Sequence, residues 1–391
     1  MLFFAIVYVV EGIGQARVGI IYQPLTYFLK VTGWTPVEVT AYLAILNFPW
    51  IIKPVFGLVS DVFPLFGYRR KSYLIVSSLC AVGAYAWIAR LSAPGEFALL
   101  LVLTSYAMAT ASTLCGALLA ENGRNFRLSS AFVSQQWLWF YIAIMASSFA
   151  GGLLIEHLTP LSALQAAAAI AAVAPLAMVV ATLFLLDERK VPISSLEMRL
   201  TLQSIVSAAK SAKLYLVALF LFLYSFAPGF GTPLYYFMTD DLKFSQTYIG
   251  ILGSIASAGW IAGALMHRWL LRRMSSQGLL YLSIVLGTLS AASFLLLTDE
   301  VTAGIVSFAN GAALMIATIA SLTLAADYCP RRSEGFAFAG LMSIMNLSEL
   351  CSNTVGAFLY EKVFHAQLGP LIIVPWLRLD RRPTNDAPTP A

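Results

Sequence analysis

The sequence predicts an all-α protein that crosses a membrane many times and is built from two similar helical halves. Three observations predict this architecture. Of the 391 residues, 59% are hydrophobic and only 11% are charged, less than half the charged share of an ordinary soluble domain. Apolar tracts long enough to cross about 30 Å of hydrocarbon recur along the chain, and residues 161–186 contain no charged residue. One segment of the first half also recurs in the second, about 210 residues later.

Apolar runs between charged or Pro/Gly-rich breaks predict eleven membrane spans. They cover residues 2–24, 38–59, 72–91, 97–120, 131–155, 161–186, 214–238, 247–270, 278–298, 301–326 and 335–360. The last apolar run, Leu368–Leu377, is about 15 Å long as a helix, which is half of what a crossing needs. Charged residues interrupt the first run, so we expect a spanning helix there and not a signal peptide.

Four regions follow from these spans. We expect a first transmembrane bundle over residues 1–186, a cytoplasmic linker over 187–212, a second bundle over 213–378 and a cytoplasmic tail over 379–391. Within the linker, Ser194-Ser195-Leu196-Glu197 is a capping-box pattern, which predicts a short interfacial helix that tethers the bundles.

The distribution of basic residues predicts the orientation. Most of the 24 Lys and Arg residues lie in alternate loops, and basic loops stay on the cytoplasmic side, so we expect a cytoplasmic amino terminus. The same distribution explains the net charge of +5 without nucleic-acid binding, because the basic residues form no patch with interleaved aromatics. No organelle transit sequence is recognisable, which favours a multi-pass protein of a bacterial inner membrane.

The internal repeat is clearest around the first and seventh spans. Pro24-Leu25-Thr26-Tyr27-Phe28 matches Pro233-Leu234-Tyr235-Tyr236-Phe237. Two parallel halves of this kind are typical of transporters that hold a substrate between them near the middle of the membrane. The register continues with Trp34-Thr35 against Phe244-Ser245 and with Trp50 against Trp260.

Ionisable side chains inside the predicted spans are candidate functional residues, because a charge in lipid is costly and normally faces a protein interior or a wet cavity. On a continuous first helix, Glu11, Gln15 and Tyr22 fall within about 40° of one another. Lys53 directly precedes Pro54 in a helix that we expect to be kinked. Lys53 either binds an anionic solute or pairs with Glu11, and both hold if protonation of Glu11 releases Lys53.

The eleventh span has a polar face of its own. Glu349 is the candidate for proton coupling there, with a structural hydrogen bond as the alternative role. The residues of this face spread over roughly a third of the helix circumference and are Ser343, Asn346, Glu349 and Asn353.

The seventh span is interrupted near its middle by two prolines and two glycines between Tyr224 and Tyr236. Such a break frees backbone polar groups, which predicts a gate, a wall of the binding site or a packing kink. Aromatic residues within the spans either stack on a planar solute or simply pack, and they are Trp50, Tyr235, Tyr236 and Trp260.

Catalytic and metal-binding arrangements are not recognisable, so we expect neither an enzyme nor a cofactor. The histidines lie singly at span ends, at His157, His267 and His365. The cysteines lack metal-ligand spacing and predict neither zinc nor a disulfide, and they are Cys80, Cys115, Cys329 and Cys351.

The segment Phe48–Tyr73 resembles the folate-biopterin transporter family of the major facilitator superfamily. The resemblance extends over both halves, about 340 residues. It implies two six-helix bundles with pseudo-two-fold symmetry, here with a short last helix. Further matching residues are Tyr27-Phe28-Leu29-Lys30, Thr239, Leu242, Phe244-Ser245, Cys329-Pro330, Glu334, Phe338-Ala339, Leu341-Met342-Ser343-Ile344 and Asn346.

Part of that segment is similar to the superfamily's cytoplasmic gating motif, namely Gly57, Asp61, Gly67, Arg69 and Arg70. The similarity implies that Asp61 holds the cytoplasmic side shut through basic partners and a helix N-terminus. The chain departs from the family at Cys115-Gly116, where members often carry an acidic residue, and at its short last helix.

The family resemblance implies uptake of folate, pterin or similar solutes, commonly driven by protons, and adds Arg17 and Lys53 as contacts for an anion. We therefore expect a secondary active transporter that carries a small anionic solute in symport with protons. The alternatives are a carrier of an unrelated metabolite and a non-transporting membrane assembly factor, such as the facilitator-like proteins that serve pigment-protein complexes. The expected partners are solute, protons and lipid, and the expected state is a monomer.

Two sets of side chains carry this prediction, and we expect both to surround a water-accessible chamber between the halves. The proton-coupling set is Glu11 and Glu349. The solute-binding set is Arg17, Trp50, Lys53, Tyr235, Tyr236 and Asn346.

Overall fold

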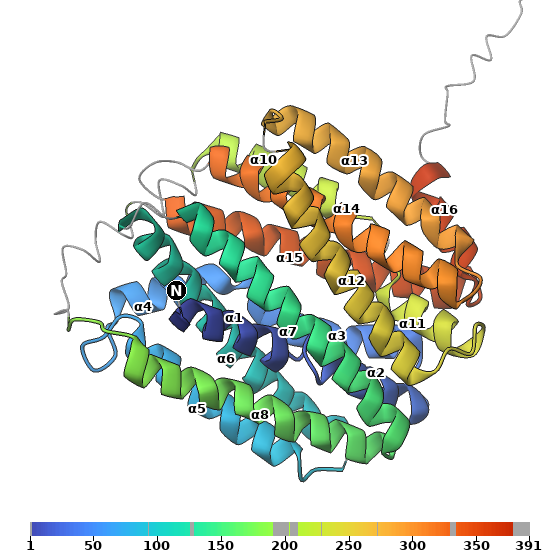
Figure 1. Cartoon of the computed structure of the whole chain (residues 1–391), viewed down its shortest axis with the longest axis horizontal. Helices are drawn as coiled ribbons and strands as arrows, with labels where there is room; N and C mark the ends of the chain where they lie inside the picture. Colours follow the sequence, from blue (N-terminus) through green and yellow to red (C-terminus); the bar gives the residue numbers. More distant parts are fainter. Residues whose placement is uncertain are drawn as a thin grey trace, which may run out of the picture.

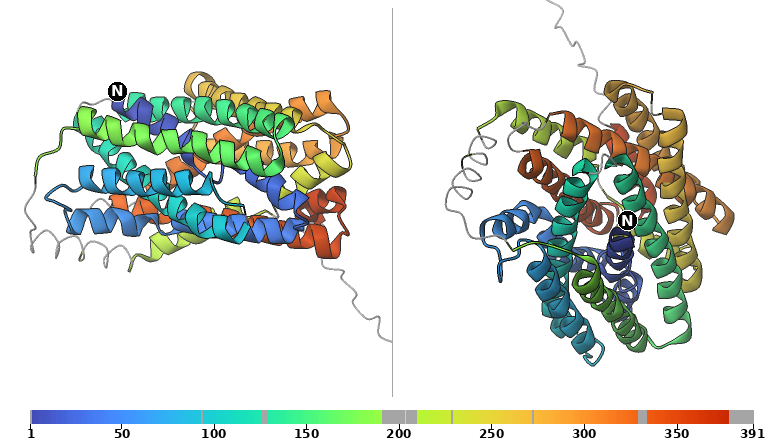
Figure 2. Two further views of the ribbon diagram at one scale, coloured as in Figure 1. Left: turned by 90° about the horizontal axis from the view of Figure 1, so that it is seen from below. Right: turned by 60° about the vertical axis from the view of Figure 1, so that its left-hand side comes forward.

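A computed structural model of the chain describes residues 2–92, 94–125, 129–190, 203, 210–227, 229–271, 273–328 and 334–377. Within these ranges the chain is nearly all helical, and the long helices run side by side along the longest axis of the molecule (Figures 1 and 2). The predicted interfacial helix of the linker and the predicted tail lie outside the described residues.

The helices of the first half are α1 (Leu2–Gly14), α2 (Tyr22–Val31), α3 (Pro36–Ile51), α4 (Lys53–Val62), α5 (Lys71–Ile88), α6 (Pro94–Asn125), α7 (Ser129–His157) and α8 (Pro160–Leu185). Those of the second half are α10 (Ala212–Ser225), α11 (Gly231–Asp240), α12 (Gln246–Met266), α13 (Ser276–Ser293), α14 (Glu300–Asp327), α15 (Glu334–Phe358) and α16 (Leu368–Leu377). A π-helical segment, Leu359–Val363, continues α15.

Eight helices of the described chain are long and apolar enough to cross a membrane, and they correspond to the predicted spans other than the first, seventh and eleventh. The first and seventh are divided into shorter helices, and the eleventh is α15 with its polar face. The kink predicted near Lys53 is confirmed, because α3 and α4 meet at Ile52. The short last helix is confirmed by the bounds of α16.

A continuous first helix over residues 2–24 is a wrong prediction. Helix α1 ends at Gly14, and the chain folds back so that the N–H of Ile20 donates to the carbonyl of Ile13 (3.2 Å). This approach is possible because residue 19 is glycine, whose absent Cβ would collide with the Ile13 carbonyl. Tyr22 therefore lies on a different helix from Glu11, and the predicted stripe is divided.

The internal repeat is confirmed in detail at the turns that join α2 to α3 and α11 to α12. Thr35 and Ser245 occupy matching N-cap positions, and each side chain accepts a hydrogen bond from the backbone N–H three residues later. Two residues earlier, Gly33 and Lys243 both have left-handed backbones, with φ of 93° and 55°. The helix breaks match as well, because α1–α2 and α10–α11 are interrupted at equivalent places in the two halves.

Two seams join the halves. Helices α3 and α4 pack against α15, and α7 packs closely along α12. At Gly152 and Gly250 the two backbones of the second seam approach so closely that a Cβ on either residue would lie within about 3.1 Å of the other's Cα. The two helix breaks lie between these seams, and they position the candidate site.

Candidate functional site

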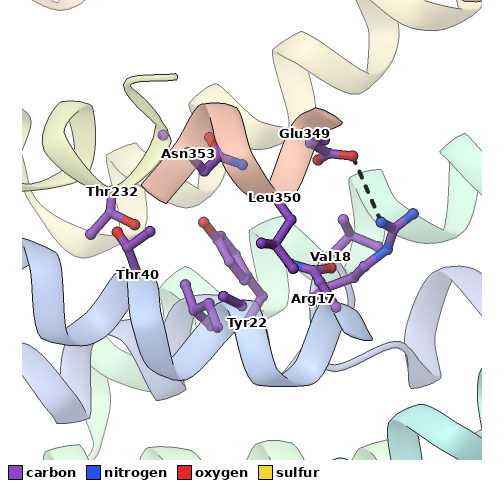
Figure 3. Close-up of a pocket in the computed structure, with 12 residues that line it drawn as sticks. Arg17, Val18, Tyr22, Thr40, Thr232, Glu349, Leu350 and Asn353 are labelled. Carbon is purple, nitrogen blue, oxygen red and sulfur yellow. Dashed lines mark ion pairs between the residues drawn. The ribbon is translucent and has the colours of Figure 1, made fainter. Parts of the chain in front are cut away.

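A cavity lies between the two halves where the broken helices meet α3 and α15 (Figure 3). It encloses about 560 Å³ of space without protein atoms, open solvent included. Its lining comes from the α1–α2 break, α2, α3, α11 and α15, and consists of Arg17, Val18, Tyr22, Thr40, Leu43, Ala44, Asn47, Gly231, Thr232, Glu349, Leu350 and Asn353.

Arg17 and Glu349 form an ion pair across this cavity. The Arg17 Nη1 to Glu349 Oε2 distance is 3.9 Å, and the dashed line in Figure 3 joins the two side chains. Arg17 is held in place, because its Nε donates to Gln15 Oε1 (3.3 Å) and its guanidinium lies 4.5 Å from the centre of the Trp50 ring. The Glu349 side chain is 60% exposed, against 22% for Arg17, so the carboxylate is the freer partner. The predicted placement of these two residues at a chamber between the halves agrees with the structure.

Trp50 is buried and does not line this cavity. Two cations lie over its ring, the guanidinium of Arg17 at 4.5 Å and the Lys53 Nζ at 4.3 Å from the ring centre. An aromatic face attracts cations through its negative electrostatic potential. In this state the ring therefore positions the two basic residues, and it is buried away from the cavity.

Glu11 and Lys53 lie behind the cavity wall, inside the first half. Lys53 Nζ donates to Ser112 Oγ (3.1 Å), and the same serine interacts with the Glu11 carboxyl group. Glu11 is 4% exposed, and its buried Oε1 has no hydrogen-bond partner among the described residues. The predicted association of Glu11 with Lys53 is thus mediated by a hydroxyl, and neither side chain lines the cavity.

Three further predicted solute contacts form hydrogen bonds outside the cavity, and those of Asn346 and Tyr236 join the two halves. Asn346 Nδ2 donates to the carbonyl of Trp50 (3.0 Å) and so joins α15 to α3. The Tyr235 hydroxyl donates to Gln246 Oε1 (2.9 Å), and the Tyr236 hydroxyl donates to the carbonyl of Trp34 (2.5 Å). None of the three lines the cavity in this structure.

We call the end of the molecule that carries the α2–α3 and α11–α12 turns the turn end. There Lys30 pairs with Asp240 and donates a hydrogen bond to Thr239. Lys30 lies in the last turn of α2 and Asp240 in the last turn of α11, and these two helices correspond in the repeat. A second contact joins the halves nearby, where the N–H of Val37 donates to Glu361 Oε2 (3.0 Å). The turn end is therefore held closed by polar contacts between the halves.

We call the other end, which carries the α4–α5 loop and the start of the linker, the linker end. Arg70 is buried there and pairs with Asp61 (2.7 Å) and Glu121 (3.4 Å), and its Nη1 donates to Ser60 (2.5 Å). All four residues belong to the first half. The pairing of Asp61 with a basic partner is the arrangement that the motif predicted.

The similarity to the gating motif also implies a contact between Asp61 and a helix N-terminus, but the start of α5 is capped by Glu188. Glu188 accepts from the backbone N–H groups of Arg69 (3.0 Å), Arg70 (3.0 Å) and Lys71 (2.7 Å), at the start of α5. Gly67 has a φ of 86°, which favours glycine, whereas a Cβ at Gly57 would make only an ordinary contact with Thr113.

The α10–α11 break is both a packing kink and a wall of the cavity. Serines of α15 satisfy its backbone, because Ser348 donates to the carbonyl of Phe222 (2.7 Å) and Ser352 donates to that of Ala227. The N–H of Gly229 donates to the Ser352 carbonyl (2.9 Å). Gly231 and Thr232, the first residues of α11, line the cavity.

Sequence reasoning missed the contribution of α3 to the cavity. A signal was present, because Thr40, Leu43, Ala44 and Asn47 follow the i, i+3, i+4, i+7 spacing of one helix face and two of them are polar. It also missed the pairing of Lys30 with Asp240.

Comparison with known proteins places the chain among transporters. Residues 14–369 match the model of the BT1 family. The chain is 29% identical to a folate-biopterin transporter of Synechocystis over 376 residues, which are 90% of this chain and 73% of that protein. It is 26% identical to probable folate-biopterin transporter 6 of Arabidopsis thaliana, over 92% of this chain and 75% of that protein.

Solved structures of similar fold are transporters of the major facilitator superfamily. A mutant of the nucleoside transporter NupG is 18% identical and superposes with a TM-score of 0.70, covering 95% of each chain. The xylose transporter XylE of E. coli, in its inward open conformation, is 12% identical with a TM-score of 0.70, covering 97% of this chain and 94% of that one. At these identities the likeness establishes the fold alone.

Proposed function

The chain belongs to the BT1 family of membrane transporters, and we propose that it carries a folate-like or pterin-like anionic solute together with protons. One observation carries the proposal, the cavity between the halves with Arg17 and Glu349 facing each other across it. Matching interruptions in two halves are where carriers of this architecture bind their substrates. The names of the relatives support the solute class.

The ion pair explains how solute and proton are coupled. Without solute, Glu349 balances the charge of Arg17. A solute carboxylate that reaches Arg17 displaces Glu349, and the displaced carboxylate then lies beside a second negative charge without its cation. Taking up a proton removes that cost, so solute and proton bind together.

Glu11 is the second candidate for a proton carrier. A buried carboxylate oxygen without a hydrogen-bond donor is costly when the group is charged, and Glu11 Oε1 is such an atom. Its nearest polar connection leads through Ser112 to Lys53, which lies beside Trp50 and hence close to Arg17. Protonation of Glu11 would leave the charge of Lys53 uncompensated close to Arg17, which favours an anion there.

The distribution of basic loops supports a cytoplasmic location of the linker end. On that orientation, contacts at the turn end close the cavity toward the outside of the cell. Carriers of this architecture work by rocking one bundle against the other around a fixed site. Outward opening then requires the Lys30–Asp240 pair and its neighbours to separate.

Uptake into proteoliposomes tests the proposal. We expect an imposed pH gradient to drive accumulation of labelled folate by the wild type. Glu349→Gln should abolish dependence on the gradient while exchange of internal for external folate persists, because exchange needs no net proton movement. Glu96→Gln, at an exposed carboxylate in the first turn of α6, is the control and should behave as the wild type.

Glu11→Gln and Lys53→Ala distinguish the two carboxylates. If Glu11 also carries a proton, Glu11→Gln should retain exchange and lose gradient-driven accumulation, whereas Lys53→Ala should weaken both. Uptake that ignores the gradient would exclude proton coupling. Failure of the wild type to take up either folate or biopterin would exclude the solute class and favour a non-transporting role in membrane assembly.

A further inference from the structure

Two polar atoms on the cavity wall have no hydrogen-bond partner among the described residues. They are Thr40 Oγ1 and Asn47 Oδ1, both on α3 and both buried atoms. Buried polar atoms in folded proteins are almost always hydrogen-bonded, so each exception calls for an explanation. The two residues are seven positions apart, about 10 Å along a helix, and therefore lie on the same face two turns from each other.

The part of the cavity around Thr40 has a different chemistry from the part around the ion pair. In Figure 3, Thr40, Thr232 and Asn353 lie on one side of the cavity, and Arg17 and Glu349 lie on the other. Arg17 and Glu349 are the charged members of the lining. The first side is thus uncharged, yet it presents hydroxyl and amide groups that both donate and accept hydrogen bonds.

We propose that Thr40, with Thr232 and Asn353 opposite, forms a separate subsite that binds the uncharged hydrogen-bonding edge of the solute's ring system, while Arg17 binds the solute's carboxylate. This subsite rests on the proposed function and assigns the two ends of the solute to different parts of the cavity. The unpartnered hydroxyl of Thr40 is a group that the solute satisfies. Burying a polar atom without a hydrogen bond destabilises the empty protein, and this loss is recovered when a solute supplies the bond. The site therefore favours solutes with donors and acceptors over apolar ones.

Two solutes separate the two ends of the site. Folate and biopterin share a pterin ring, whose edge carries amide-like donors and acceptors, but folate bears carboxylates and biopterin bears none. Loss of the Arg17 end should therefore affect folate alone. Loss of the uncharged subsite should affect both solutes.

The test measures how far each solute raises the melting temperature of the purified full-length protein in detergent, a readout of binding that does not require transport. Thr40→Val replaces the hydroxyl by a methyl group of similar size. We expect about a tenfold weaker apparent affinity for both solutes. Because the unpartnered hydroxyl is gone, we also expect the solute-free variant to melt no lower than the wild type. Thr40→Ser, which keeps the hydroxyl, should restore binding.

A matched control is available in α8. Thr182 is fully buried, its hydroxyl also lacks a partner among the described residues, and it lies away from the cavity lining. Thr182→Val should leave the response to both solutes as in the wild type. Arg17→Gln should remove the response to folate and keep that to biopterin.

Three outcomes would overturn the subsite. Thr40→Val binding both solutes as the wild type does would show that the hydroxyl contacts no solute. Arg17→Gln losing both solutes equally would show that the cavity has no separate ends. A wild type that responds to neither solute would exclude the proposed solute class, and the subsite with it. A wild type that binds both solutes but fails to transport them would leave the subsite standing and exclude the carrier.

Discussion

The two ends of the molecule use similar ion pairs for different purposes. At the turn end, Lys30 of the first half pairs with Asp240 of the second. At the linker end, Arg70 pairs with Asp61 and Glu121 of its own half. In each case a well-buried basic side chain meets carboxylates that are partly exposed.

This difference predicts which substitutions should change the conformation of the carrier and which should change its stability. A pair that joins the halves contributes to one conformation of the carrier and is lost in the other, so removing it changes the balance between them. A pair within one half persists when that half moves as a rigid body. Removing such a pair should destabilise the half itself.

The largest effect is expected at Arg70. Arg70→Ala leaves Ser60 and two carboxylates without their shared cation, and we expect the free energy of unfolding to fall by about 2–3 kcal/mol. The measurement is thermal unfolding in detergent. Arg70→Lys should recover part of the loss, because it restores the charge but not the forked set of donors. An unchanged unfolding temperature for Arg70→Ala would show that the network does not stabilise the first half.

A charge reversal at Lys30 should have a smaller effect on stability and a clear effect on conformation. Lys30→Asp places two carboxylates opposite each other and should favour opening of the turn end, with the open-to-closed ratio rising roughly tenfold. The distance between spin labels at Val31 and Asp241, in a background without the native cysteines, reports this opening.

Because the two side chains pair directly across the halves, exchanging their charges provides a control. Lys30→Asp combined with Asp240→Lys should restore the closed distance, since the pair is re-formed with the halves interchanged. Opening by the double variant as wide as by Lys30→Asp would argue that the pair does not hold the turn end closed.

Local sequence patterns predicted the features that depend on one segment at a time. Hydropathy located the spans because lipid acts on each residue according to its own polarity, and the repeat was visible because both halves kept the same turn chemistry at Thr35 and Ser245. The α1–α2 break was not predicted. It depends on the close approach of Gly19 to the Ile13 carbonyl, a contact that hydropathy does not register.

The candidate site was predicted only in part. Glu349 was chosen as a charge within a predicted span and Arg17 through the family resemblance, and the two meet at the cavity. Tyr235 and Tyr236 were chosen as aromatic residues near a helix break, but their hydroxyls bind groups at the turn end. Helical spacing predicts which face a residue occupies. It does not predict which other segment lies opposite that face, and this decided the roles of the tyrosines.

The smallest effect expected is a pH dependence of the turn end through Glu361. Although partial burial opposes it, hydrogen bonds from Lys362, from the N–H of Val37 and from Thr35 lower the pKa of the Glu361 carboxyl below its ordinary value of 4.5. A lowered pKa in the folded state stabilises the closed contact above the ordinary value, and this contribution is lost as the pH falls through the lowered one. The unfolding temperature of the wild type should therefore decline below about pH 4.5 more steeply than that of Glu361→Gln. Because Arg70 lies at the other end, Arg70→Lys should decline in parallel with the wild type, and equal slopes for the wild type and Glu361→Gln would exclude a contribution from Glu361.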